Sequence, residues 1–127
     1  MAPRLHQTFL MVSDIDRSTA FYRDALGLEV AERGERSTAF ETGEAELMLE
    51  QDFSEEELAA FGLIPPGEQR GDGVIVVVEV EDVEAVHEQA VAAGADVVME
   101  PTEVDWGREM FLVRDPDGYV LELSRPV

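Results

Sequence analysis

The stretch Val12-Ser13-Asp14-Ile15 recurs later in the chain as Val80-Glu81-Asp82-Val83, and this repeat decides the fold. In each copy a short apolar run precedes the shared frame and a helical pattern follows it. A glycine ends that pattern 15 residues after Val12 and 14 residues after Val80. Aspartate is a favoured helix cap, and glycine readily adopts the left-handed conformation that ends a helix. The repeat therefore predicts two copies of one structural module.

Three strand-like segments follow each predicted helix, so each module is expected to be βαβββ. The segments are residues 28–33, 37–42 and 45–52 in the first copy, and residues 96–101, 108–114 and 119–125 in the second. The linker around Pro66 separates module one, residues 1–66, from module two, residues 67–127. A chain of 127 residues suits a single domain made of both modules.

The two modules are expected to pair, because a four-stranded half-sheet cannot bury both of its faces alone. We predict an α+β fold in which a pseudo-twofold axis joins the modules into one curved eight-stranded mixed sheet. The helices would lie outside, and the concave face would enclose a cavity. Such a cavity is the expected place for a binding or active site.

The charge balance excludes several classes of function. The chain has 29 acidic residues against nine basic ones, all of them arginine, which gives a net charge of −20. Such a field repels phosphates and anionic lipids, so neither nucleic acid nor a membrane is an expected partner. Evenly spread carboxylates are typical of a surface adapted to high salt. The absence of cysteine excludes thiolate chemistry, and without an apolar run of signal or membrane length the protein is expected to be cytoplasmic.

Two motifs carry a family resemblance. They are Phe21-Tyr22-Arg23-Asp24-Ala25-Leu26-Gly27-Leu28 and Asp115-Pro116-Asp117-Gly118-Tyr119-Val120-Leu121-Glu122-Leu123. In this order and spacing the chain resembles the vicinal-oxygen-chelate superfamily, which includes glyoxalases, extradiol dioxygenases, fosfomycin-modifying enzymes and bleomycin-binding resistance proteins. The resemblance spans nearly the whole chain. It implies paired βαβββ modules, a small-molecule ligand in the cavity and a homodimer.

The resemblance also implies where a metal ion would bind. Metal-dependent members take one ligand from the first strand and one from the last strand of each module, and counting along this chain gives Gln7, Glu50, Ile75 and Glu122. Ile75 stands where the family has histidine, and its side chain cannot coordinate. The remaining set, Gln7, Glu50 and Glu122, would favour Mg²⁺ or Mn²⁺ over Ni²⁺ or Zn²⁺. The missing ligand favours a site without a resident cofactor.

Alternation along the strands predicts which side chains line the cavity. The expected ligand-binding residues are Gln7, Phe9, Met11, Met48, Ile75, Val77, Glu79, Trp106, Met110 and Leu112. Trp106 suits stacking on a planar or cationic ligand, or else fills a sheet edge or dimer seam. Neither His6 nor His87 is expected to face the cavity.

Three functions stay open. The first is a protein similar to the bleomycin-binding resistance proteins, which holds a small molecule without a full metal site. The second is a divalent-metal-dependent lyase, isomerase or dioxygenase-like enzyme that uses Gln7, Glu50 and Glu122, with Glu122 as the catalytic base. The third is a metal-free epimerase or isomerase. Met11 stands where the glutathione-using relatives carry a basic residue, which disfavours a lactoylglutathione lyase.

Overall fold

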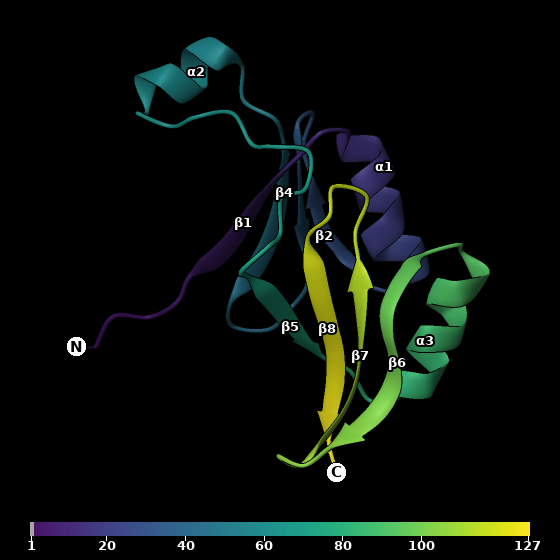
Figure 1. Cartoon of the computed structure of the whole chain (residues 1–127). Coiled ribbons are helices and arrows are strands. Elements are labelled where there is room, and N and C mark those ends of the chain that lie inside the picture. Colours follow the sequence, from purple (N-terminus) through teal and green to yellow (C-terminus); the bar gives the residue numbers. More distant parts are fainter. Residues whose placement is uncertain (1) are drawn as a thin grey trace.

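The computed structural model describes residues 2–127 and contains two four-stranded sheets with helices along one side (Figure 1). Module one consists of β1 (Gln7–Val12), α1 (Ile15–Ala20), the π-helical turn η1 (Phe21–Ala25), β2 (Val30–Arg33), β3 (Ser37–Phe40) and β4 (Glu46–Gln51). Helix α2 (Glu55–Ala60) lies in the linker. Module two consists of β5 (Ile75–Glu79), α3 (Val83–Ala92), β6 (Asp96–Val104), β7 (Arg108–Arg114) and β8 (Val120–Pro126). The predicted βαβββ order is confirmed in both modules.

The two sheets have the same topology. Their strand orders are β1-β4-β3-β2 and β5-β8-β7-β6, with the first pair of each sheet parallel and the others antiparallel. The predicted single eight-stranded sheet differs from this arrangement, because within residues 2–127 no strand pairing joins the two sheets. β1 and β5 are instead the edge strands of their own sheets.

The helical segments of the two modules, α1 with η1 and α3, begin and end as their sequences predict. The Asp14 side chain accepts from the backbone N–H of Arg17, and Asp82 accepts from that of Ala85. Gly27 and Gly94 follow the helices with φ of 79° and 78°. The first helix differs from a regular α-helix at Phe21, where the backbone widens into a π turn and the N–H of Leu26 donates to the Phe21 carbonyl over 3.2 Å.

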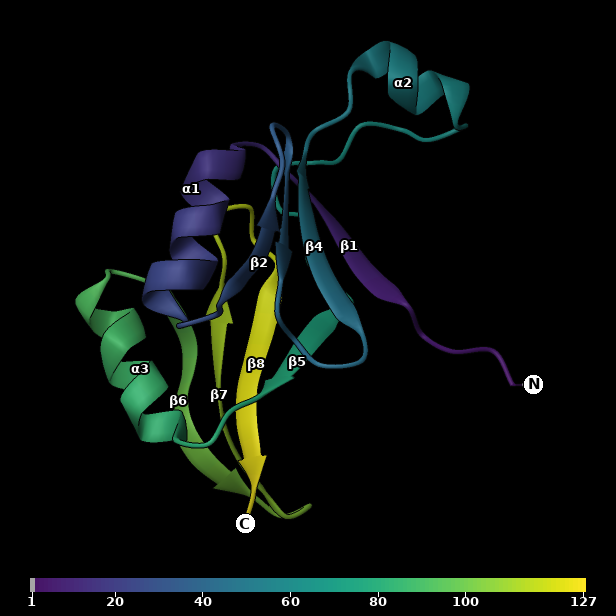
Figure 2. The same cartoon turned by 180° about the vertical axis from the view of Figure 1, so that it is seen from behind.

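One hydrophobic core is shared by the two modules. Tyr22 and Leu49 of module one and Phe111 and Leu123 of module two are all completely buried in it. Figure 2 shows α1 and α3 on the same side of the sheets, and the side-chain amide of Gln89 in α3 donates to the Asp24 carbonyl in η1. The modules are therefore joined through their helix-bearing faces.

The opposite face of each sheet carries no helix, and we call it the open face. Because alternate residues of β1 and β8 are buried in the core, the intervening residues lie on the open face. For module one these include Gln7, Phe9, Met11, Glu46, Met48 and Glu50, and for module two Ile75, Val77, Glu79, Met110, Leu112, Glu122 and Ser124.

Helix α2 lies in a segment that projects away from both sheets (Figures 1 and 2). Its start is fixed by a capping box, in which Ser54 and Glu57 exchange side-chain to backbone hydrogen bonds of 2.9 and 3.1 Å. Across residues 2–127, none of the helices has the length and apolar character that a membrane crossing requires.

Candidate functional site

The two sequence motifs meet in a buried hydrogen bond between the modules. The Tyr22 hydroxyl donates to Asp115 Oδ2 over 2.7 Å, while Asp115 Oδ1 accepts from the backbone N–H groups of Asp117 and Tyr119 at 2.9 Å each. Burial is the main cause that raises the pKa of Asp115 above its ordinary value, and the three donors oppose that rise. Burial, followed by the charge of Asp115, raises the pKa of Tyr22 well above its ordinary value. This contact fixes the β7–β8 turn against module one.

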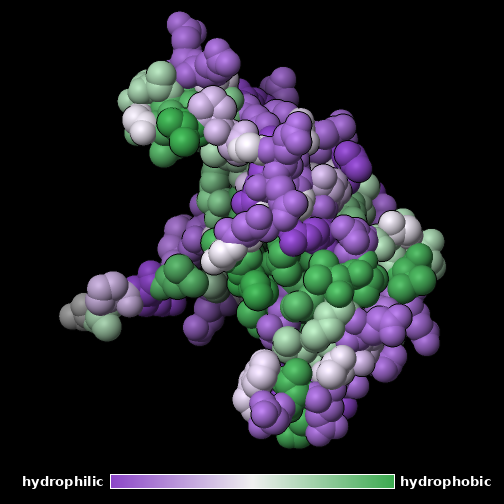
Figure 3. Space-filling view, in the orientation of Figure 1, coloured by the Kyte–Doolittle hydropathy of each residue, from purple (hydrophilic) through white to green (hydrophobic). Residues whose placement is uncertain are grey.

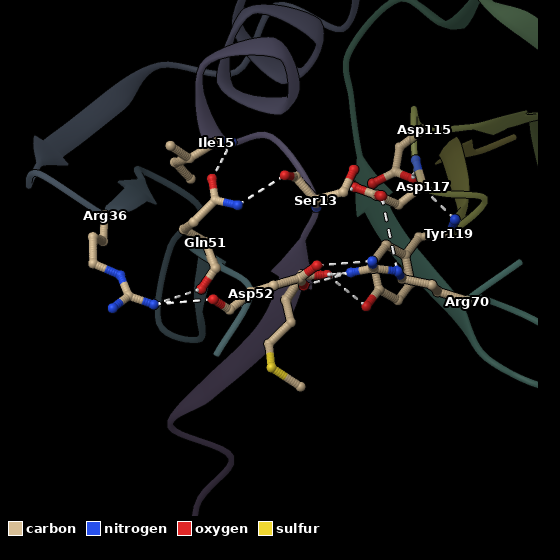
Figure 4. A network of polar contacts seen from close by, with 10 residues as sticks. Ser13, Ile15, Arg36, Gln51, Asp52, Arg70, Asp115, Asp117 and Tyr119 are labelled. Atoms are coloured by element: carbon tan, nitrogen blue, oxygen red, sulfur yellow. Dashed lines mark hydrogen bonds and ion pairs between the residues drawn. The ribbon is translucent and has the colours of Figure 1, made fainter. Parts of the chain in front are cut away.

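Arg70, from the linker, extends this network to the ends of β1 and β4 (Figure 4). Its guanidinium makes a bidentate contact with Asp52 at 2.6 and 2.9 Å and also donates to the Met11 carbonyl over 3.1 Å. The hydrogen bond to Asp52 is the main cause that raises the pKa of Arg70. The Tyr119 hydroxyl donates to the same Met11 carbonyl over 2.8 Å. These contacts hold the end of β1 in a fixed position.

The open face of module one has a polar contact at one end. The side-chain amide of Gln7 donates to Glu46 Oε1 over 2.6 Å and lies 3.3 Å from the Met48 sulfur. The strand register pairs Gln7 with Glu46, Phe9 with Met48 and Met11 with Glu50. Glu50 is therefore four residues along the strand from Gln7, or about 13 Å at the usual rise of a strand. The structure does not bring these two expected metal ligands together.

The open face of module two carries an arginine that sequence reasoning missed. Arg108 donates to Ser124 Oγ over 3.0 Å and to Glu79 Oε1 over 3.1 Å. Ser124 is completely buried, whereas the Glu79 side chain is mostly exposed. Met110 and Leu112 lie on this face as the alternation predicts, and the same alternation counted back from Met110 would have located Arg108.

The family described as the glyoxalase/bleomycin resistance protein/dioxygenase superfamily matches residues 4–123. The chain belongs to this superfamily. A lactoylglutathione lyase from Haemophilus influenzae is 30% identical over 91% of this chain and 87% of its own length. A probable lactoylglutathione lyase from Vibrio cholerae is also 30% identical, over 94% of this chain and 88% of its own.

Several solved structures share the fold of this chain. A protein of unknown function from Agrobacterium tumefaciens has a TM-score of 0.82 at 26% identity and covers 100% of this chain and 97% of its own. UcmS2 has a TM-score of 0.69 at 31% identity, with 98% of each chain covered. A glyoxalase/bleomycin resistance protein/dioxygenase family enzyme from Burkholderia phytofirmans has a TM-score of 0.80 at 21% identity, over 98% and 100% of the two chains.

The strand register changes which residue of module one corresponds to Glu122. In module two Glu122 lies opposite Val77, the second residue after Ile75 on its face. The equivalent place in module one lies opposite Phe9, the second residue after Gln7, and Met48 occupies it. Gln7 and Met48 of module one therefore correspond to Ile75 and Glu122 of module two, and of these four side chains only Gln7 and Glu122 carry oxygen donors.

These residues do not fit a resident divalent metal ion. The thioether of Met48 and the aliphatic side chain of Ile75 supply neither the oxygen nor the nitrogen ligand that such an ion needs. Among residues 2–127, no three His, Cys, Asp or Glu side chains lie together in a way that would hold a metal. His6 is exposed just before β1, and His87 is half-buried, with its ring centroid 5.3 Å from that of Phe111 in an edge-to-face arrangement.

Four methionine side chains lie on the open faces. Met11 and Met48 lie on that of module one, where each is half-buried. Met99 and Met110 lie on that of module two, in register with Leu112 and Ser124. These four are all the methionines of the chain other than Met1. Methionine is flexible and polarisable, so it adapts to ligands of irregular shape.

The remaining expected ligand-binding residues lie at exposed positions. The exposed fractions are 41% for Phe9, 53% for Ile75, 57% for Val77 and 67% for Trp106. Ile75, Val77 and Glu79 line a groove of about 730 Å³ between β5 on one side and, on the other, the segment that follows η1 and the β3–β4 turn. Trp106 lies at the tip of the β6–β7 hairpin, where the sequence placed a loop. A second groove, of about 520 Å³, lies between η1 and the end of α3, away from the open faces.

Proposed function

We propose that this protein binds a small, largely apolar molecule on its open faces and holds no resident metal ion there. The strand register supports this proposal, because Met48 pairs with Phe9 in module one as Glu122 pairs with Val77 in module two, and neither Met48 nor Ile75 offers an oxygen or nitrogen ligand. The open faces then form an apolar surface rich in methionine, with the carboxylates of Glu46, Glu50 and Glu122 on it and Arg108 paired with Glu79 in module two. Such a surface suits an apolar ligand that carries a positive charge.

A second copy of the chain would complete the cavity. β1 and β5 are edge strands, and the side chains of Phe9, Ile75 and Val77 on their open faces are about half exposed. Pairing of β1 in one copy with β5 in another would produce the curved eight-stranded sheet and enclose these side chains. We therefore expect a homodimer, which light scattering after gel filtration would detect; a monomer at high salt and high concentration would contradict this arrangement.

Binding of an apolar cation tests the proposal directly. Tetraphenylphosphonium titrated into the protein by calorimetry should bind, and Glu122→Gln and Met48→Ala should each weaken it. Exposed Glu88→Gln, on α3, is the matched charge control and should leave the affinity unchanged. Equal affinity in the Glu122→Gln and Glu88→Gln variants would contradict the assignment of this face.

Metal titration tests the other half of the proposal. Mn²⁺, Ni²⁺ and Zn²⁺ should bind the wild type weakly, without a stoichiometric step. Because the register assigns two vacant ligand positions, Ile75→His alone should improve Ni²⁺ binding less than the double variant Ile75→His with Met48→Glu. Stoichiometric binding to the wild type that disappears in Glu122→Gln would overturn the metal-free site.

A metal-dependent lyase is the second candidate, and the 30% identity to lactoylglutathione lyases favours it. This activity would use Gln7, Glu50 and Glu122, with Glu122 as the base. The strand register opposes that set, because Glu50 pairs with Met11 and not with Gln7. Turnover of the hemithioacetal of methylglyoxal and glutathione, measured with added Mn²⁺, Ni²⁺ or Zn²⁺, would establish the lyase; we expect none.

A further inference from the structure

The linker segment around α2, residues 53–64, projects from the body as an arm with an uncovered apolar side. Leu58 is buried within it, but Phe61, Leu63 and Ile64 have exposed fractions of 67%, 48% and 85%. Figure 3 shows apolar residues on the side of this projection that faces the hollow between it and the N-terminal segment. Polar residues cover much of its other side. The chain's own fold leaves this apolar side without a partner.

An aromatic row joins the arm to the open face of module one. The ring of Phe9 lies 6.0 Å from that of Phe53, and the ring of Phe53 lies 5.8 Å from that of Phe61. The interplanar angles are 57° and 43°, so the rings are tilted against one another. Phe9 is on the open face beside Met48, whereas Phe61 is at the end of α2. The aromatic surface is therefore continuous from the sheet to the arm.

The charged side chains beside this row favour a ligand that carries a positive charge. The charged side chains on the open-face positions of β1 and β4 are the carboxylates of Glu46 and Glu50, and no arginine occupies such a position. An aromatic ring favours contact with another ring and with a cation.

We propose that Phe9, Phe53 and Phe61 form a subsite for a flat aromatic cation, with the arm as one wall of the binding site. The inference rests on the proposed function and specifies its ligand class. Aromatic rings of the ligand would stack against Phe53 and Phe61, and its positive charge would lie toward Glu50, which is at the end of β4 nearer the arm. Neither Phe53 nor Phe61 was expected from the strand pattern, because both lie in the linker.

Binding of three probes to matched variants tests the subsite. Ethidium is a flat aromatic cation, tetrabutylammonium is a cation without rings, and 1-anilinonaphthalene-8-sulfonate is an aromatic anion. Calorimetry at one fixed salt concentration should show that the wild type prefers ethidium. Phe61→Ala should weaken ethidium about 5- to 10-fold, corresponding to the loss of one aromatic contact. Val91→Ala, which removes an exposed apolar side chain of α3 outside the arm, should change the affinity by less than about twofold.

The outcomes separate this inference from the proposed function. Phe61 is mostly exposed, so Phe61→Ala should keep the wild-type unfolding curve. If ethidium binding is weakened by Glu122→Gln but is the same in Phe61→Ala and the wild type, the subsite is overturned and the proposed function stands. If Phe61→Ala changes the molecular mass in light scattering without changing ethidium affinity, the arm is a contact between copies and the subsite is again overturned. If the wild type binds neither these probes nor tetraphenylphosphonium, both proposals fail.

Discussion

The Tyr22→Phe substitution removes a single hydroxyl group that joins the two modules. This hydroxyl donates to Asp115 over 2.7 Å, and Tyr22 is completely buried. A buried hydrogen bond to a charged acceptor contributes about 1.5–3 kcal/mol, and the phenylalanine ring keeps the contacts that Tyr22 makes with Phe21 and Phe40. We expect the free energy of unfolding to fall by about 2 kcal/mol at neutral pH, which lowers Tm by roughly 6–10 °C in a domain of this length.

The loss should depend on pH because Asp115 titrates differently in the folded and unfolded chain. Burial raises the pKa of Asp115 in the folded protein, so the stability it contributes is fully present below its unfolded pKa and decreases as pH rises through its folded pKa. The Tyr22 hydroxyl opposes that rise in pKa. Removing it moves the folded pKa of Asp115 further up, so the difference between wild type and variant should increase with pH.

Urea unfolding followed by circular dichroism from pH 4 to pH 8, at constant ionic strength, measures this difference. Tyr119→Phe is the matched control, because its hydroxyl donates to the uncharged Met11 carbonyl. That variant should lose about 1 kcal/mol at every pH. A Tyr22→Phe loss that is independent of pH, or smaller than the Tyr119→Phe loss, would refute the assignment of a charged Asp115 as the acceptor.

Three further predictions concern the linker and the surface. Arg70→Met keeps the side-chain volume but leaves Asp52 and the buried Asp117 without their cation, so urea unfolding should show a loss of about 2–4 kcal/mol. Gly71→Ala should lower the free energy of unfolding by about 1–3 kcal/mol in the same assay, because the added Cβ would lie 2.6 Å from the Gly118 carbonyl oxygen. Gly67→Ala is its control and should leave the stability unchanged, because a Cβ at Gly67 has no atom within 4 Å. Thermal unfolding should shift upward from dilute buffer to molar KCl as salt screens the charge of −20, and an unchanged Tm would contradict adaptation to salt.

The repeat and its two motifs predict the modules because these features are local. A cap, an apolar stripe and a terminal glycine each act within a few residues, so the sequence alone locates both helices and all eight strands. The two motifs look independent along the chain, but Tyr22 of the first donates to Asp115 of the second across 93 residues. Their joint presence is therefore one structural requirement, which explains why the pair indicates the superfamily better than either motif alone.

The relation between the two sheets could not be predicted in the same way. The pattern shows that each sheet has one face for the core, but edge strands β1 and β5 can remain unpaired, pair with each other or pair with another copy. Buried residues from both modules share one core on the helix side, and this packing decides how the modules lie within one chain. The choice depends on contacts between distant residues, for which the strand pattern carries no signal.

The case of Glu50 shows where strand periodicity stops being informative. Glu46, Met48 and Glu50 alternate along β4, so all three lie on the open face, and the period of two cannot distinguish them. Only the register between β4 and β1 decides which of these three residues pairs with Gln7 and which pairs with Phe9. In a chain with 29 acidic residues, a glutamate often lies two positions from Met48 by chance, as Glu50 does, and from the sequence alone it can be mistaken for a metal ligand. Because Phe9 pairs with Met48, this methionine has the place in module one that Glu122 has in module two. The shift of two residues, from Glu50 to Met48, changes the chemistry that we infer for the open face from metal coordination to apolar binding.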